Sequence, residues 1–140
     1  MLKKLEQLHD EVEAFITAQE ALLSGGEPPT TDEIARARWK LMAASRRRRD
    51  YVDEAIYPAL SPILSGDTAG MLAALRERDV AQRHWASAHL ADWPIERIEA
   101  EFGTYQPAAL EVFRRMRAHL RDERNVLMTL LSMNPIEEGR

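Results

Sequence analysis

Residues 113–130, FRRMRAHLRDERNVLMTL, decide the fold class of this chain. Apolar residues recur there every three or four positions, which is the period of one face of an α-helix. The members of this apolar face are Phe113, Met116, Leu120, Leu127 and Leu130. One carboxylate, Glu123, interrupts the face, and a lone ionised carboxylate in an apolar core costs several kcal/mol. Glu123 must therefore be paired, protonated or bound to a metal, which predicts a polar layer among packed helices.

The composition limits the classes of protein to be considered. The chain has 140 residues, of which 45% are apolar and 30% charged, so it is long enough for one domain with a sizeable core. The net charge of −4 gives no overall electrostatic support for binding nucleic acid. The absence of cysteine excludes disulfides, thiolate catalysis and thiolate-ligated metals.

We expect a cytoplasmic protein, because a reducing compartment is the simplest fit to a chain without cysteine, and we expect no membrane and no nucleic-acid partner. The start, MLKKLEQLHDEVEAF, is amphipathic and carries acidic residues early, which does not resemble a signal peptide. No apolar run approaches the roughly 20 residues that a membrane span needs. The helix faces leave two kinds of protein interaction to consider: a homodimer, or a different protein partner.

Glycine and proline clusters divide the chain into helices. We predict long helices over residues 2–23, 32–57, 68–92 and 107–132, and a short helix over residues 94–102. Thr31 is the expected N-cap of the second long helix, and Asp67 or Thr68 that of the third. Pro58 is expected to break or kink the chain, and Gly103 to end the short helix.

These elements predict an all-α fold, since no segment shows a useful strand alternation. Four long helices joined by short connections are typical of an antiparallel, up-down-up-down four-helix bundle. We assign residues 1–133 to this single domain and expect residues 134–140, which end in EEGR, to be a frayed tail.

Counting from the loops places several polar residues at one depth. Antiparallel helices can be compared in this way because each residue advances the helix by about 1.5 Å. The residues predicted to share a level, on or beside the apolar faces, are His9, Arg48, Asp79, His119 and Glu123. His119 and Glu123 form an H-x-x-x-E pair on one helix face, able to share a metal or a hydrogen bond. A His–Glu pair satisfied within the core, without metal, is the competing interpretation.

Three segments resemble the hemerythrin-like, HHE cation-binding family. They are LHDEVEAF around His9, VDEAIYPAL at the end of the second helix, and HLRDERNVLMTLL around Glu123, and the resemblance covers most of the chain in order and spacing. It implies a four-helix bundle that holds two non-haem irons between its helices. In that family the first and third helices each supply a histidine, and the second and fourth each supply an H-x-x-x-E pair. By position, His9 matches the first-helix ligand, and His119 and Glu123 match the fourth-helix pair.

The departures from the family pattern concern the second and third helices. Arg48 occupies the second-helix histidine position and Val52 the glutamate position. Arginine stays protonated in proteins and cannot ligate a metal. On the third helix His84 points away from the apolar face, and His89 lies more than two turns from Asp79.

Arg48 has two interpretations. It can face inward and supply a permanent positive charge in place of the metal, with Asp79 and Glu123 as acceptors. This fits its position on the line from Leu41 through Ser45 to Val52. Alternatively it extends to solvent with its neighbours in the run of residues 46–49, which are all arginine.

The sequence therefore predicts a hemerythrin-like bundle with a degenerate di-iron site. It would have no catalytic residues and no cofactor, and would act as a non-enzymatic binding, sensory or regulatory module. The first alternative is a non-haem iron protein that binds or senses oxygen or nitric oxide at a reduced mono- or di-iron site. The ligands of that site would come from His9, His119, Glu123 and His89, with Asp79 as a further candidate. The second alternative is a helical protein–protein interaction module. No nucleophile–base pair, phosphate loop or zinc motif is present.

Overall fold

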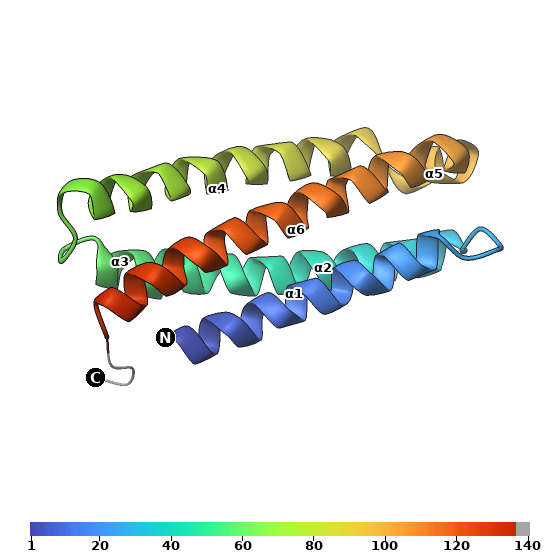
Figure 1. Ribbon diagram of the computed structural model, residues 1–140. Coiled ribbons are helices and arrows are strands. Elements are labelled where there is room, and N and C mark those ends of the chain that lie inside the picture. The colour runs from blue at the N-terminus through green and yellow to red at the C-terminus, as the bar shows by residue number, and fades with distance from the viewer. Residues whose placement is uncertain (137–140) are drawn as a thin grey trace.

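The computed structural model describes residues 1–136, which are almost entirely helical and contain no β-strand, so the all-α prediction is confirmed (Figure 1). The elements are α1 (Leu2–Leu23), α2 (Thr31–Tyr51), a π-helix η1 (Val52–Ile56), α3 (Tyr57–Leu60), α4 (Gly66–Asp92), α5 (Ile95–Ala100) and α6 (Phe102–Met133). Figure 1 shows α1, α2, α4 and α6 alongside one another with alternating chain direction. The EEGR segment predicted to fray lies at 137–140, outside the described residues.

The start of α2 corrects the predicted N-cap by one residue. Thr30, not Thr31, caps the helix, because its hydroxyl accepts a hydrogen bond from the Glu33 backbone N–H at 3.1 Å. The Glu33 side chain accepts in return from the Thr30 backbone N–H at 3.2 Å. This reciprocal capping box satisfies two backbone donors that the first turn leaves free.

Helical structure continues through Pro58, where the sequence analysis expected a break or a kink. Pro58 has no N–H, and its ring would crowd the carbonyl of Glu54 in a regular α-helix. The chain widens into the π-helix η1 just before it, in which the Tyr57 N–H reaches back to the Val52 carbonyl. The helix then runs on as α3 to Leu60.

The predicted start of α4 is also corrected. Neither Asp67 nor Thr68 is the N-cap; Ser65 holds that position without a side-chain cap hydrogen bond. Gly66 follows with φ of 58°, a left-handed conformation that favours glycine. The Thr68 hydroxyl instead donates to the Ser65 carbonyl at 2.9 Å.

The predicted short helix exists as α5, but Gly103 does not end it. Glu101 closes α5, and α6 begins at Phe102 instead of near Pro107. Gly103 lies in the first turn of α6, and Pro107 lies inside the helix. Pro107 is the sixth residue of α6, beyond the first turn, so the helix forgoes one backbone hydrogen bond there.

Two apolar clusters form the core, one toward each end of the long helices. The first lies toward the α1–α2 loop and includes Val12, Ile16, Ile34, Leu41, Tyr105, Phe113 and Leu120. The second lies toward the α3–α4 loop and includes Leu5, Val52, Ile56, Leu75, Leu127 and Leu130. On α1, α2 and α6 the residues between the clusters include the polar side chains singled out in the sequence, so both clusters border the same layer.

The helices do not contact one another equally. The closest backbone contacts join α1 to α2, α1 to α6 and α4 to α6, while α2 and α4 are not one of these main pairs. Part-exposed ion pairs link neighbouring elements, as Arg78 does with Asp122 at 2.9 Å and Arg83 with Asp53 at 2.8 Å. Such pairs contribute at most about 1 kcal/mol each, so they orient the helices more than they stabilise them. None of the helices within residues 1–136 has an apolar stretch long enough to cross a membrane.

Candidate functional site

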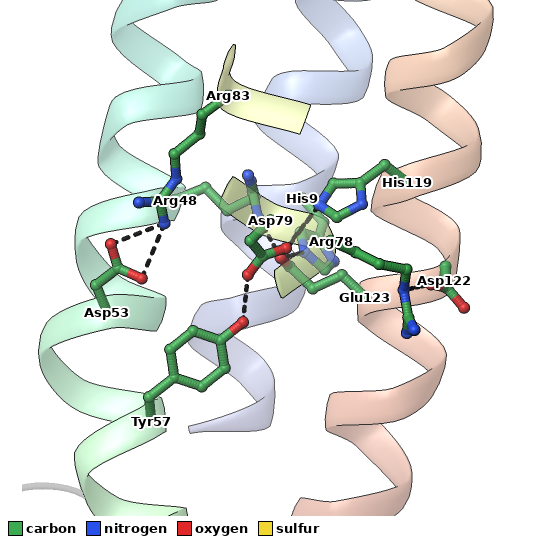
Figure 2. A network of polar contacts seen from close by, with 10 residues as sticks. All are labelled: His9, Arg48, Asp53, Tyr57, Arg78, Asp79, Arg83, His119, Asp122 and Glu123. Carbon is green, nitrogen blue, oxygen red and sulfur yellow. Dashed lines mark hydrogen bonds and ion pairs between the residues drawn. The ribbon is translucent and has the colours of Figure 1, made fainter. Parts of the chain in front are cut away.

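The five residues predicted to share one level lie together between the two apolar clusters (Figure 2). Four helices supply them: His9 on α1, Arg48 on α2, Asp79 on α4, and His119 with Glu123 on α6. All five side chains are buried or nearly so. We call this set the polar layer.

Glu123 is the central acceptor of the polar layer. Its side chain is 0% exposed, and its Oε1 accepts a hydrogen bond from Arg48 and lies 3.1 Å from His9 Nε2. Burial by itself disfavours the charged carboxylate and acts to raise its pKa. The positive charge of Arg48, with hydrogen bonds from His9, Asp79 and Arg48, outweighs burial and holds the pKa of Glu123 well below its usual range. Glu123 is therefore ionised at neutral pH.

Arg48 faces inward, which decides between its two interpretations. Its side chain is only 12% exposed and pairs with Glu123, whereas the side chains of Arg46 and Arg47 are more than half exposed. A permanent cation and a buried anion thus neutralise each other across α2 and α6.

Asp79 forms the second half of the polar layer. The Tyr57 hydroxyl donates to its Oδ2, and His119 Nε2 lies 2.7 Å from its Oδ1. Burial and the negative charge of Glu123 raise the pKa of Asp79, although the contacts with His119 and Tyr57 act in the opposite direction. Burial and the hydrogen bond to Asp79 also raise the pKa of Tyr57. Two carboxyl groups in one layer therefore have their pKa values pushed apart.

Replacing Asp79 with asparagine should change how stability depends on pH. Because the folded-state pKa of Asp79 is raised above the ordinary value of 3.8, the folded protein holds this proton more tightly than the unfolded chain. The contribution of Asp79 to stability is then full below about pH 3.8 and declines as pH rises through the folded pKa. Asp79→Asn should lack this decline.

The measurement is the free energy of unfolding of both proteins in urea at a series of pH values upward from 3.8. The wild type should lose stability relative to Asp79→Asn as pH rises. A difference that is constant, or that moves in the opposite direction, would show that Asp79 is not held protonated by burial.

Tyr57 is a sixth residue that hydrogen-bonds to the polar layer, and sequence reasoning missed it. In the sequence it stands only within the segment VDEAIYPAL at the end of the second predicted helix. Its side chain is buried and reaches Asp79 from the element that follows η1. An aromatic residue five positions after the apolar Val52 was the available signal. The π-helix that sets the direction of the Tyr57 side chain has no clear sequence signature.

Removing the Tyr57 hydroxyl should destabilise the protein. Tyr57→Phe leaves the ring in place but strands a buried carboxyl oxygen of Asp79, which costs about 1–3 kcal/mol. Tyr105→Phe is the matched control, since Tyr105 is equally buried and its hydroxyl has no hydrogen bond to a described residue. Thermal and urea unfolding should separate the two variants, and equal stability losses would contradict a special role for the Tyr57 hydroxyl.

Asp79, His119 and Glu123 form one group that could hold a metal ion. Their ligand atoms lie within 4.8 Å of one another. The residues present do not fit the di-iron centre that the resemblance implies, however. The guanidinium of Arg48 is bonded to Glu123, and Val52, at the position of a carboxylate ligand, is apolar and 0% exposed. A cation site here would have to form against the charge of Arg48.

The structure does not place His89 in this group, which corrects its inclusion among the candidate metal ligands. His89 lies ten residues after Asp79 on α4, a distance of about 15 Å along the helix axis. Its ring stacks on Tyr105 with the centroids 6.0 Å apart. Burial and the nearby charge of Arg38 lower the pKa of His89. His9 is closer to the group, but it contacts Glu123 and is not one of the three grouped ligands.

A cavity of about 470 Å³ opens beside the polar layer, along the gap between α2 and α4. Arg48, Asp79 and His119 line one part of it, and Leu90 and Tyr105 line another. This volume falls within the range of small-molecule sites, roughly 300–1,000 Å³. Comparisons of the chain with family models, with curated proteins and with solved structures found no match. The polar layer and this cavity are therefore the observations that bear on function.

Proposed function

We propose that the protein is a hemerythrin-like, antiparallel four-helix bundle whose di-iron site is degenerate. An ion-pair network would take the place of the metal, and the protein would serve as a non-enzymatic binding, sensory or regulatory module. The order and spacing of His9, His119 and Glu123 support this, as do four long helices of alternating direction.

The observation that carries the proposal is the pairing of Arg48 with Glu123 inside the polar layer. In a metal site the buried carboxylate needs a cation to balance its charge. Arg48 supplies that charge permanently, since a guanidinium does not lose its proton in proteins. Val52 removes the carboxylate that would bridge two metals, and it packs in the apolar cluster instead. The scaffold would thus keep its buried charge balanced without an ion.

The test is metal content. Protein purified without chelator should contain no stoichiometric iron by elemental analysis. Anaerobic titration with Fe(II), followed by exposure to air, should produce no oxo-bridged absorption bands, because Arg48 repels a divalent ion at Glu123. Two tightly held irons per chain would contradict the proposal.

A second candidate is a reduced metal site, favoured by the grouping of Asp79, His119 and Glu123 within 4.8 Å. A carboxylate–imidazole–carboxylate set suits iron or zinc. Such a protein would bind or sense oxygen or nitric oxide, and Arg48 would have to leave Glu123 when the metal bound. One equivalent of metal in the titration, abolished by His119→Ala, would support this candidate over the first.

A further inference from the structure

Most of the charged side chains that line the cavity between α2 and α4 are arginines. Five arginines line it, together with a single acidic residue, Asp79: Arg38, Arg46, Arg48, Arg49 and Arg83. Asp79 already accepts a hydrogen bond from Tyr57 and pairs with His119. Of these arginines, Arg48, Arg83 and Arg46 already pair with Glu123, Asp53 and Asp50. Arg38 and Arg49 have no carboxylate partner among the described residues, and their positive charges favour an anionic ligand in the cavity.

Donors without partners gather where the cavity borders the polar layer. Arg48 Nε and Gln82 Nε2 are buried and have no hydrogen-bond partner among the described residues. Arg49 is half-buried, lines the same cavity, and has no hydrogen bond or ion pair with a described residue. Two guanidinium groups and an amide are suited to a carboxylate, which accepts several hydrogen bonds on two oxygens.

The cavity is elongated, and apolar side chains stand beside polar ones such as Arg38 and His89 along its length. Its lining along α4 runs from Asp79 to Leu90, about 16 Å of helix axis. The apolar side chains there include Leu41, Val112, Phe113, Met116, Leu120 and Leu90. Two large apolar residues that line it, Trp39 and Met42, are 69% and 51% exposed. Large apolar side chains left this open are typical of a surface that a ligand covers.

We infer that this cavity binds a monocarboxylic acid with an unbranched apolar chain. The carboxylate lies by Arg49, Gln82 and the free edge of Arg48, and the chain extends along Phe113 and Met116 toward Tyr105. The inference rests on the proposed function in treating the bundle as a binding module, and it names the class of ligand. Binding next to the Arg48–Glu123 pair would connect the ligand to the polar layer.

The test uses decanoate as the probe in isothermal titration calorimetry, with 1-decanol and acetate as comparisons. Decanoate should bind at least about ten-fold more tightly than either, because 1-decanol lacks the charge and acetate lacks the chain. Arg49→Gln should weaken decanoate binding about ten-fold through loss of a charge-assisted hydrogen bond. Arg121→Gln, an exposed α6 arginine outside the cavity lining, is the control and should bind like the wild type.

A second pair of variants tests the place of the apolar chain. Ala86 lines the cavity, so Ala86→Phe should fill it and abolish decanoate binding. Ala88→Phe adds the same ring to an exposed position of α4 outside the lining and should leave binding unchanged. Circular dichroism checks that both variants fold.

Three outcomes of the binding experiments would overturn the inference. They are no binding of decanoate, equal binding of 1-decanol, and equal effects of the cavity variants and their controls. A dimer in light scattering that Ala86→Phe dissolves would also overturn it, by identifying a second copy as the occupant. Metal content is measured on the same sample. If the protein is metal-free and does not bind decanoate, only the proposed class of ligand is refuted. If it contains stoichiometric iron, the proposed function is refuted, whether or not decanoate binds.

Discussion

Replacing Glu123 with alanine should lower the free energy of unfolding by about 3–5 kcal/mol, the cost of breaking a buried ion pair. The change removes the acceptor of Arg48 and the partner of His9, and leaves the guanidinium charge stranded in the layer between the two apolar clusters. Urea unfolding monitored by circular dichroism measures the loss. Asp122→Ala is the matched control on the same helix, because the Asp122–Arg78 pair is half exposed and should cost under about 1 kcal/mol.

A double-mutant cycle separates the pair from its surroundings. Arg48→Met replaces the guanidinium with an apolar chain and leaves the charge of Glu123 without its cation. The double variant Arg48→Met with Glu123→Ala should be more stable than the sum of the two single losses predicts, since no unpaired charge remains. Small and additive effects would mean that the two side chains do not interact in solution, and the ion-pair explanation of the polar layer would fail.

The double variant Arg48→His with Val52→Glu should gain affinity for Fe(II) or Zn(II). It restores H-x-x-x-E on the second helix and removes the guanidinium cation that pairs with Glu123. Both positions face the buried layer, and Asp79, His119 and Glu123 already group there. Because metal binds the folded state, it should raise the melting temperature in proportion to the logarithm of its concentration. No histidine of α4 lies at this level, so one metal is expected instead of two.

The control is the same motif on the solvent side of the same helix. Arg46→His with Asp50→Glu creates H-x-x-x-E where both side chains are largely exposed and no third ligand is grouped. It should show a much smaller metal-dependent shift in melting temperature. If the buried variant folds but its shift does not exceed that of the control, positions 48 and 52 do not point at Glu123 in solution.

Periodicity and fixed helix geometry made part of the site predictable from the sequence. A residue advances an α-helix by a constant amount, so counting from the loops was enough to put His9, Arg48, Asp79 and Glu123 at one level. The cost of burying an unpaired carboxylate then required a partner for Glu123, whichever residue supplied it. These inferences need only the constant rise of a helix and the cost of burying an unpaired charge. The amino-acid sequence is therefore enough to make them.

The tertiary structure decided what depends on how the helices are rotated and separated. Arg48 had two allowed directions, and the packing of α2 against α1 together with the pairing to Glu123 on α6 selected the inward one. Tyr57 reaches Asp79 only because the π-helix before Pro58 changes the direction of the side chains that follow. The cavity exists because α2 and α4 are not in close backbone contact, a spacing set by side chains of all four long helices. The sequence by itself determined the helices and the depth of their polar residues, whereas rotation and spacing arise from many weak contacts that no single segment encodes.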